Sequence, residues 1–235
     1  MPKNLLAISI LLALYIEVSA QLPKSILKPV QRVSVFDDYD GTIYERLSYK
    51  ISYVTDEISG NYTAELRYNI YTDAIEYKSD SNVYELNKRN TLSVRIEDDY
   101  FYYCEFRTDR GLKRDGYYVL VELNDTYRIY KKYELIIKEP QQNTMTQLSE
   151  PGSIKQTTTY YLEERGTVVE LPMKKKDLLS IFSDKENELE EYMKKEKIRL
   201  KKEEDLIRLV ARYNAIKNMD DRSSKSLLSN KYTGN

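Results

Sequence analysis

The stretch that decides the fold class is RLSYKISYVTDEISGNYTAELRYNI, residues 46–70. Apolar and polar side chains alternate through both of its halves, and a period of two is typical of a β-strand with one half-buried face. Ser59, Gly60 and Asn61 separate the halves and favour a turn. We therefore predict a β-hairpin. The side chains expected to share a face are Leu47, Tyr49, Ile51 and Tyr53 in the first strand, and Ala64, Leu66, Tyr68 and Ile70 in the second.

Further strands are predicted on both sides of an aperiodic region. They cover residues 74–78, 83–86, 92–97, 100–106, 117–123, 127–138, 157–163 and 167–171. Their short spacing, with polar turns between them, favours an antiparallel meander over crossover units. Residues 139–153 lack periodicity and are predicted to be a loop.

After Pro172 the apolar spacing becomes helical. We predict helices over residues 174–182 and 203–216, and between them a third helix that starts at a capping box formed by Ser183 and Glu186. The fold class is therefore predicted to be α+β, an antiparallel β meander (an open sheet or a partly closed barrel) followed by C-terminal α-helices. The predicted parts are a signal peptide (1–20), a β-rich domain (21–172), a helical segment packed on the sheet (173–217) and a flexible tail (218–235).

The first twenty residues have the pattern of a signal peptide. Lys3 supplies the positive charge, residues 5–16 are the apolar core, and Val18-Ser19-Ala20 supplies small residues before a cut between Ala20 and Gln21. The apolar run is shorter than the ~20 residues that a membrane-spanning helix needs. We therefore expect export to the periplasm, the cell surface or the medium, without an integral membrane span after cleavage.

Composition excludes several kinds of chemistry. The chain has 37 basic and 38 acidic residues and a formal net charge of −1, which gives no support for nucleic-acid binding. It contains no histidine, so Ser-His and Cys-His nucleophile pairs and imidazole zinc sites are excluded. Its one cysteine, Cys104, cannot form an intramolecular disulfide. We predict no catalytic residue, no metal site and no cofactor.

Four short motifs have a chemical interpretation and a simpler structural one. Glu97-Asp98-Asp99 could supply paired carboxylates, but we strongly favour a charged turn between strands. Asp38-Tyr39-Asp40-Gly41 resembles part of a calcium loop, yet the first and last ligand positions do not fit, so we predict an Asp-Gly turn. Cys104 is predicted to be a buried structural cysteine. The lysines of residues 174–176 and 194–202 alternate with acids and are predicted to be solvated.

Tyrosine is the unusual residue, with 23 copies against four phenylalanines and no tryptophan. Tyrosines on strands can form a core whose hydroxyls lie at a wet margin, or an exposed platform for a sugar or a peptide. Their alternation with polar residues fits both, and we favour the core.

Several segments together resemble a family of uncharacterised exported proteins from Bacteroidota. They are Leu66 to Lys78, Gly116-Tyr117, Lys131-Lys132-Tyr133, Tyr160-Tyr161-Leu162, Lys174 to Leu179, Lys201 to Ile207, and Tyr213-Asn214. The resemblance covers most of the chain after residue 20 and implies export and a sheet followed by helices. It implies no catalytic residue and no ligand.

We therefore expect an exported envelope protein that acts as a non-catalytic binding or structural module for an unknown envelope ligand or protein. The alternatives are a carboxylate-dependent hydrolase acting on an extracytoplasmic substrate, and an outer-membrane β-barrel. A hydrophobic cavity between sheet and helices would favour ligand carriage.

Overall fold

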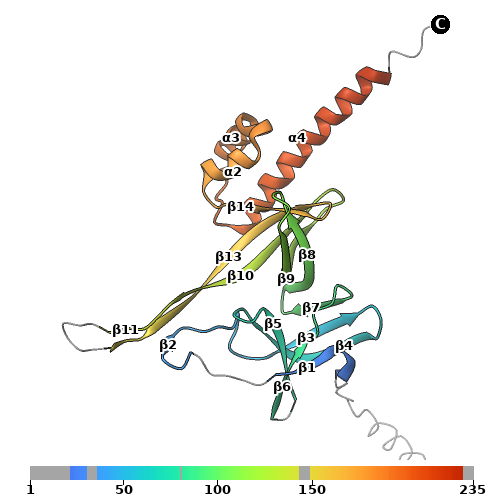
Figure 1. Cartoon of the computed structure of the whole chain (residues 1–235). Helices are drawn as coiled ribbons and strands as arrows, with labels where there is room; N and C mark the ends of the chain where they lie inside the picture. The colour runs from blue at the N-terminus through green and yellow to red at the C-terminus, as the bar shows by residue number, and fades with distance from the viewer. Residues whose placement is uncertain (1–21, 31–35, 80, 143–148, 230–235) are drawn as a thin grey trace, which may run out of the picture. The chain divides into compact units, whose positions relative to one another are not determined.

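The structure is a computed structural model that describes residues 22–30, 36–79, 81–142 and 149–229, with residues 149 and 219–229 described by their backbone alone. The predicted signal peptide and its cleavage site, Ala20 and Gln21, lie outside the described residues. Strands followed by C-terminal helices confirm the α+β prediction (Figure 1). No helix in the described ranges is both long and apolar enough to cross a membrane.

The chain forms two compact units that interleave along the sequence. Unit 1 consists of the residues up to Cys104 together with Glu134–Thr157, and unit 2 consists of Glu105–Tyr133 together with the residues from Thr158 onward. Three strands supply residues to both units: β8 (Asp99–Thr108), β10 (Arg128–Lys138) and β13 (Gly152–Glu164). This grouping cuts across the predicted boundary at residue 172, which separates strands from helices.

The sheet of unit 1 contains the predicted meander. Its strand order is β1-β6-β5-β4-β3-β7-β8, and each of these neighbouring pairs is antiparallel. The strands not yet given are β1 (Leu27–Pro29), β3 (Lys50–Asp56), β4 (Gly60–Asn69), β5 (Ala74–Ser79), β6 (Asn82–Leu86) and β7 (Leu92–Ile96). The hairpin predicted from residues 46–70 is the β3–β4 pair.

Strand β3 alternates as predicted, but its more apolar face is the exposed one. Ile51 and Tyr53 are 68% and 56% exposed, whereas Ser52, Val54 and Asp56 are buried. The buried polar groups are satisfied locally, since the Ser52 hydroxyl donates to the Lys50 carbonyl at 2.7 Å and Asp56 accepts from the Ser59 hydroxyl at 2.5 Å. Burying them therefore costs little.

A short strand, β2 (Tyr39–Asp40), replaces the predicted Asp-Gly turn and pairs in parallel with β13 at Gly152. Two glycines allow this close approach. Gly41 has a φ of +111°, and a Cβ there would lie 2.3 Å from the backbone oxygen of Ile154. A Cβ on Gly152 would lie 2.4 Å from the ring of Tyr39. The predicted loop at 139–153 is likewise partly extended, because β11 (Gln141–Gln142) pairs with β12 (Ser149–Glu150) and β13 begins at Gly152.

In unit 2 the strands close into a ring. The order is β8-β14-β13-β10-β9, with β14 (Thr167–Leu171) and β9 (Lys113–Leu123), and β9 also pairs with β8. The β14–β8 pair is parallel, so the sheet is mixed rather than wholly antiparallel. Phe106, Tyr118 and Tyr161 are buried in this unit, and the Tyr118 ring lies 5.0 Å from Phe106 and 5.6 Å from Tyr161. In unit 2, therefore, buried tyrosines do form core.

The helices of unit 2 bury the predicted apolar stripes. The helices are α2 (Lys175–Ile181), the short 3₁₀ segment η2 (Ser183–Lys185), α3 (Glu186–Lys195) and α4 (Glu203–Ser229). Leu178, Leu189, Leu206 and their neighbours form one core with strand residues that include Ile129 and Leu171. Each such fully buried aliphatic side chain contributes about 1.5–3 kcal/mol. The helical segment therefore packs on the strands of unit 2.

Two local helix predictions fail. The capping box is wrong, because Ser183 begins η2, and α3 starts at Glu186 without a side-chain cap. The last helix also runs beyond its predicted end at residue 216, to Ser229, into the segment predicted to be a tail. Backbone hydrogen bonding continues there although apolar residues are sparse, since helix propensity does not need an apolar stripe. The flexibility of residues 218–235 stays a prediction.

Candidate functional site

The structure places the motifs singled out from the sequence in structural roles. Glu97 and Asp98 form the turn between β7 and β8, and the Glu97 carboxylate pairs with Arg46 at 2.6 Å and Lys50 at 3.2 Å. Cys104 is only partly buried, which corrects the prediction of a buried cysteine, and its sulfur lies 3.7 Å from the Tyr102 carbonyl oxygen. Within the described part of the chain, no cluster of acidic or cysteine side chains could hold a metal ion.

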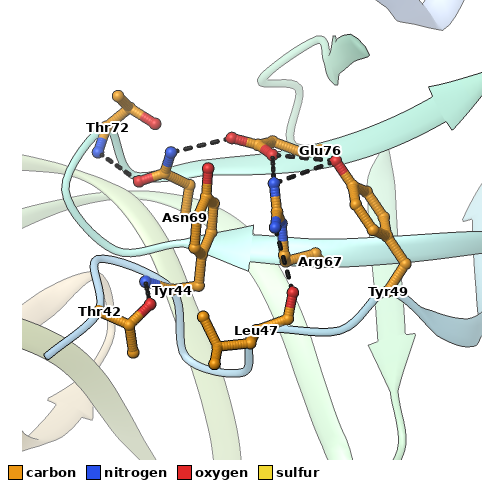
Figure 2. A network of polar contacts seen from close by, with 8 residues as sticks. All are labelled: Thr42, Tyr44, Leu47, Tyr49, Arg67, Asn69, Thr72 and Glu76. Atoms are coloured by element: carbon orange, nitrogen blue, oxygen red, sulfur yellow. Dashed lines mark hydrogen bonds and ion pairs between the residues drawn. The ribbon is translucent and has the colours of Figure 1, made fainter. Parts of the chain in front are cut away.

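The most concentrated polar arrangement is a buried ion pair in unit 1 (Figure 2). Arg67 on β4 and Glu76 on β5 are 8% and 4% exposed, and Nη2 of Arg67 lies 2.6 Å from Oε2 of Glu76. The Tyr49 hydroxyl donates to the same oxygen at 3.2 Å, and Nδ2 of Asn69 donates to Oε1 at 2.9 Å. Both carboxylate oxygens are therefore occupied.

Two tyrosines enclose the guanidinium of Arg67. Its central carbon lies 3.5 Å from the ring centroid of Tyr44 and 4.4 Å from that of Tyr49, close enough for cation–π attraction. Nη1 of Arg67 donates to the Leu47 carbonyl at 3.1 Å. Nε of Arg67 is buried and has no hydrogen-bond partner among the described residues. This Arg67 clamp (Tyr44, Tyr49, Arg67, Asn69 and Glu76) fastens segment 42–49 to the β4–β5 hairpin.

The same face of the sheet continues over β3, β7 and β8, where it is open. Directly opposed residues of an antiparallel pair share a face, and the register sets Tyr53 opposite Arg95 and Arg95 opposite Tyr100. Tyr53 and Tyr100 are exposed, and their ring centroids lie 5.9 Å and 5.3 Å from the guanidinium carbon of Arg95. We call these three residues the Tyr–Arg–Tyr row.

The clamp and the row each place an arginine against two tyrosines on the same face of the sheet, but Arg67 is buried and Arg95 is exposed. Strand periodicity puts Thr63 and Arg67 of β4 on the same face, and Thr63 lies opposite Tyr53. In the clamp, Glu76 and segment 42–49 accept hydrogen bonds from both terminal nitrogens of Arg67. In the row, Nε of Arg95 donates to the Glu97 carbonyl at 3.0 Å, and the described residues supply no partner for its two terminal nitrogens. The row is therefore the better candidate for binding another molecule.

Unit 2 contains a small hollow between the helices and the strands. Its volume is about 250 Å³, and it is lined by side chains of β13, β14, α2 and α4 that include Leu162, Phe182, Tyr213 and Lys217. Lys217 lies 3.5 Å from the Glu164 carboxylate and 5.6 Å from the ring centroid of Tyr213. This volume is below the roughly 300–1,000 Å³ of typical small-molecule pockets.

Tyr213 is expected to make the free energy of unfolding depend on pH in the alkaline range. Burial, together with the charge of Asp184 and a hydrogen bond to it, raises the pKa of the Tyr213 hydroxyl from 10.0 to about 12. The folded chain therefore holds this proton more tightly than the unfolded chain, so its stabilising effect is complete below pH 10 and is lost as the pH rises toward 12. We expect the free energy of unfolding, measured with urea, to fall less steeply over this range in Tyr213→Phe than in the wild type. An equal slope would show that Tyr213 is not the group responsible.

Comparisons with family models, curated proteins and solved structures give no match to this chain.

The sequence contains part of the signal for the Tyr–Arg–Tyr row. The alternation around Ile51 and Tyr53 marks one face of β3, but nothing local shows that this face is exposed. Arg95 and Tyr100 join it only through strand register, which a single sequence does not determine. Asp56 and Ser59 give one local indication that the opposite face of β3 is buried, because an aspartate followed by a serine three residues later favours a turn that satisfies a buried carboxylate.

Proposed function

We propose that this chain is an exported envelope protein that works as a non-catalytic binding module, and that it binds through the exposed face of β3, β7 and β8 in unit 1. The observation that carries the proposal is the orientation of β3, which presents Ile51 and Tyr53 to solvent while it buries Ser52 and Asp56. Exposed apolar and aromatic side chains that cluster on one face mark interaction sites. Export, and membership in the exported Bacteroidota family, belong to the same proposal and rest on the sequence of residues 1–20 and on the resemblance.

The site geometry supports binding over the two other activities considered. A hydrolase needs carboxylates that converge on a reacting bond, yet Glu76 is enclosed in the Arg67 clamp and Glu97 is paired with Arg46 and Lys50. Carriage of a hydrophobic ligand needs a larger cavity than the 250 Å³ hollow of unit 2. Tyrosines suit a binding face, because they combine a large apolar ring with a polar hydroxyl.

The proposal predicts that the binding of isolated bacterial envelopes depends on this face. We expect the variant Ile51→Thr/Tyr53→Thr to lower the association constant for envelope fragments about tenfold, which corresponds to about 1.4 kcal/mol, in a sedimentation assay with the mature protein. Threonine is β-branched, a shape that strands favour, so the strand itself is retained.

The matched control is Leu112→Thr/Leu123→Thr, which alters two side chains that are equally exposed but lie in unit 2. It should change the association constant less than twofold. If both double variants bind envelopes as the wild type does, the face of β3 is not the binding surface and the proposal fails.

A further inference from the structure

We propose that the Tyr–Arg–Tyr row binds an uncharged polysaccharide, with one sugar ring on each tyrosine and the arginine donating to the hydroxyl groups between them. This inference rests on the proposed function and names the class of ligand for the same face.

The spacing of the row suits alternate sugar rings of one extended glycan chain. Tyr53 on β3 and Tyr100 on β8 are separated by one strand, β7, so their backbones lie two strand spacings apart, about 10 Å. That separation is close to the distance between alternate rings of an extended glycan. A tyrosine ring offers a flat apolar surface to the C–H face of a sugar and a hydroxyl for a hydrogen bond at its edge.

Arg95 is held in place for donation between the two rings. Nε is anchored on the Glu97 carbonyl at 3.0 Å, and the guanidinium carbon lies within 6 Å of both tyrosine centroids. Because Arg95 is exposed, its terminal nitrogens can donate outward in the fixed fork that a guanidinium provides. A pair of sugar hydroxyls, or a ring oxygen and a hydroxyl, fits such a fork.

The charges around the row favour an uncharged ligand. Charges of both signs surround the row: the basic side chains are Arg95 itself, Arg46 and Lys50, and the acidic ones include Glu65, Glu97 and Asp98. Glu45 and Asp99 add further negative charge beside Arg46. A polyanion would meet these carboxylates, and a polycation would meet Arg95, so neither is electrostatically complementary.

Apart from Ile51 and Tyr102, the rest of the face is polar, which suits glycan binding. Thr63 lies opposite Tyr53, and Thr55 lies opposite Ser93 on the same face. Their hydroxyls can exchange hydrogen bonds with a hydrated sugar. A stable protein interface instead needs about 800 Å² per partner around an apolar centre, and Ile51 is the one aliphatic side chain that these strand positions supply.

The test is native gel electrophoresis of the mature protein through gels that contain a neutral polysaccharide: β-glucan, galactomannan, xylan or α-glucan, each in turn. Gels with polygalacturonate and gels without polysaccharide are run in parallel. We expect at least one neutral polysaccharide to retard the protein more than polygalacturonate does. Tyr53→Ala and Tyr100→Ala should each weaken that association about tenfold, and Arg95→Gln about fivefold.

Tyr71→Ala serves as the control, because Tyr71 is an exposed tyrosine of unit 1 that packs on Phe36, outside the row. It should alter retardation less than twofold, and circular dichroism should show the wild-type fold for all four variants. Absence of retardation by every neutral polysaccharide, stronger retardation by polygalacturonate, or retardation that survives both row tyrosine substitutions would each overturn the inference.

The two proposals fail in different ways. If envelopes bind the wild type but not Ile51→Thr/Tyr53→Thr, and no neutral polysaccharide retards the protein, the binding face stands and the glycan inference is overturned. Loss of envelope binding after protease treatment of the envelopes would then identify a protein partner. If the face variant still binds envelopes, the proposed function fails as well.

Discussion

Replacing Arg67 with leucine is expected to lower the free energy of unfolding by about 3–5 kcal/mol, the cost of leaving one member of a buried ion pair without its partner. Glu76 would remain buried and would lose its 2.6 Å contact with Nη2 of Arg67. Tyr44 and Tyr49 would lose the cation that lies between their rings. Urea denaturation followed by tyrosine fluorescence and circular dichroism measures the change.

A comparison within the same unit separates burial from charge. Lys88 pairs with Asp73 at 2.8 Å, but both side chains are partly exposed, and Lys88→Leu should cost no more than about 1 kcal/mol. The double variant Arg67→Leu/Glu76→Leu should recover part of the loss, because it removes the unpaired charge together with the pair. A cost for Arg67→Leu no larger than that for Lys88→Leu would contradict the clamp as a stabilising element.

Gly41→Ala is the second substitution with a large expected effect, a destabilisation of about 2–6 kcal/mol. A φ of +111° is strained for any residue with a side chain, and the new Cβ would lie 2.3 Å from the backbone oxygen of Ile154. Strain of this kind costs roughly 1–3 kcal/mol, and forcing the β2 and β13 backbones apart adds about 1–3 kcal/mol. Thermal and urea denaturation both report the loss.

Gly60 provides the matched control, because it has a similar φ of +103° and nothing within 4 Å of an added Cβ. Gly60→Ala should therefore show the backbone strain alone, about 1–3 kcal/mol. The difference between the two alanine variants isolates the close approach of β2 to β13. If they destabilise the protein equally, Gly41 is required only for its φ.

The elements of this fold follow from local patterns, whereas their faces and partners do not. The β3–β4 hairpin was predictable because alternation and turn residues are local properties. The helical stripes at Leu178 and Leu206 were predictable for the same reason, with a period of 3.6. Which side of β3 is exposed was not predictable from the sequence. It depends on which face of the sheet the rest of the chain covers, and on the local hydrogen bonds that satisfy Ser52 and Asp56.

Long-range pairings account for the other failures. The parallel contacts of β2 with β13 and of β14 with β8 join residues far apart in the sequence, and no local signal specifies them. The Arg67 clamp has the same origin, since Tyr44, Tyr49, Arg67 and Glu76 come from three segments. The Tyr–Arg–Tyr row again depends on register, so the residues proposed to bind could be identified only from the assembled sheet.

The tyrosines show why composition alone left two interpretations open. Tyr118 and Tyr161 are core residues of unit 2, whereas Tyr53 and Tyr100 are exposed on unit 1. The buried tyrosines have apolar neighbours on both sides in the sequence, whereas Tyr53 and Tyr100 each follow a polar residue. The preference for a core was therefore correct for one set and wrong for the other.

The interleaving of the two units has a consequence for how the protein is made. A ribosome that has finished residue 104 has not yet made Glu134–Thr157, the remainder of unit 1. Strand β2 must wait for β13, more than a hundred residues later, before it gains its partner at Gly152. Unit 1 is therefore complete only after residue 157, when part of unit 2 has already been made, and no single truncation point can release either unit on its own.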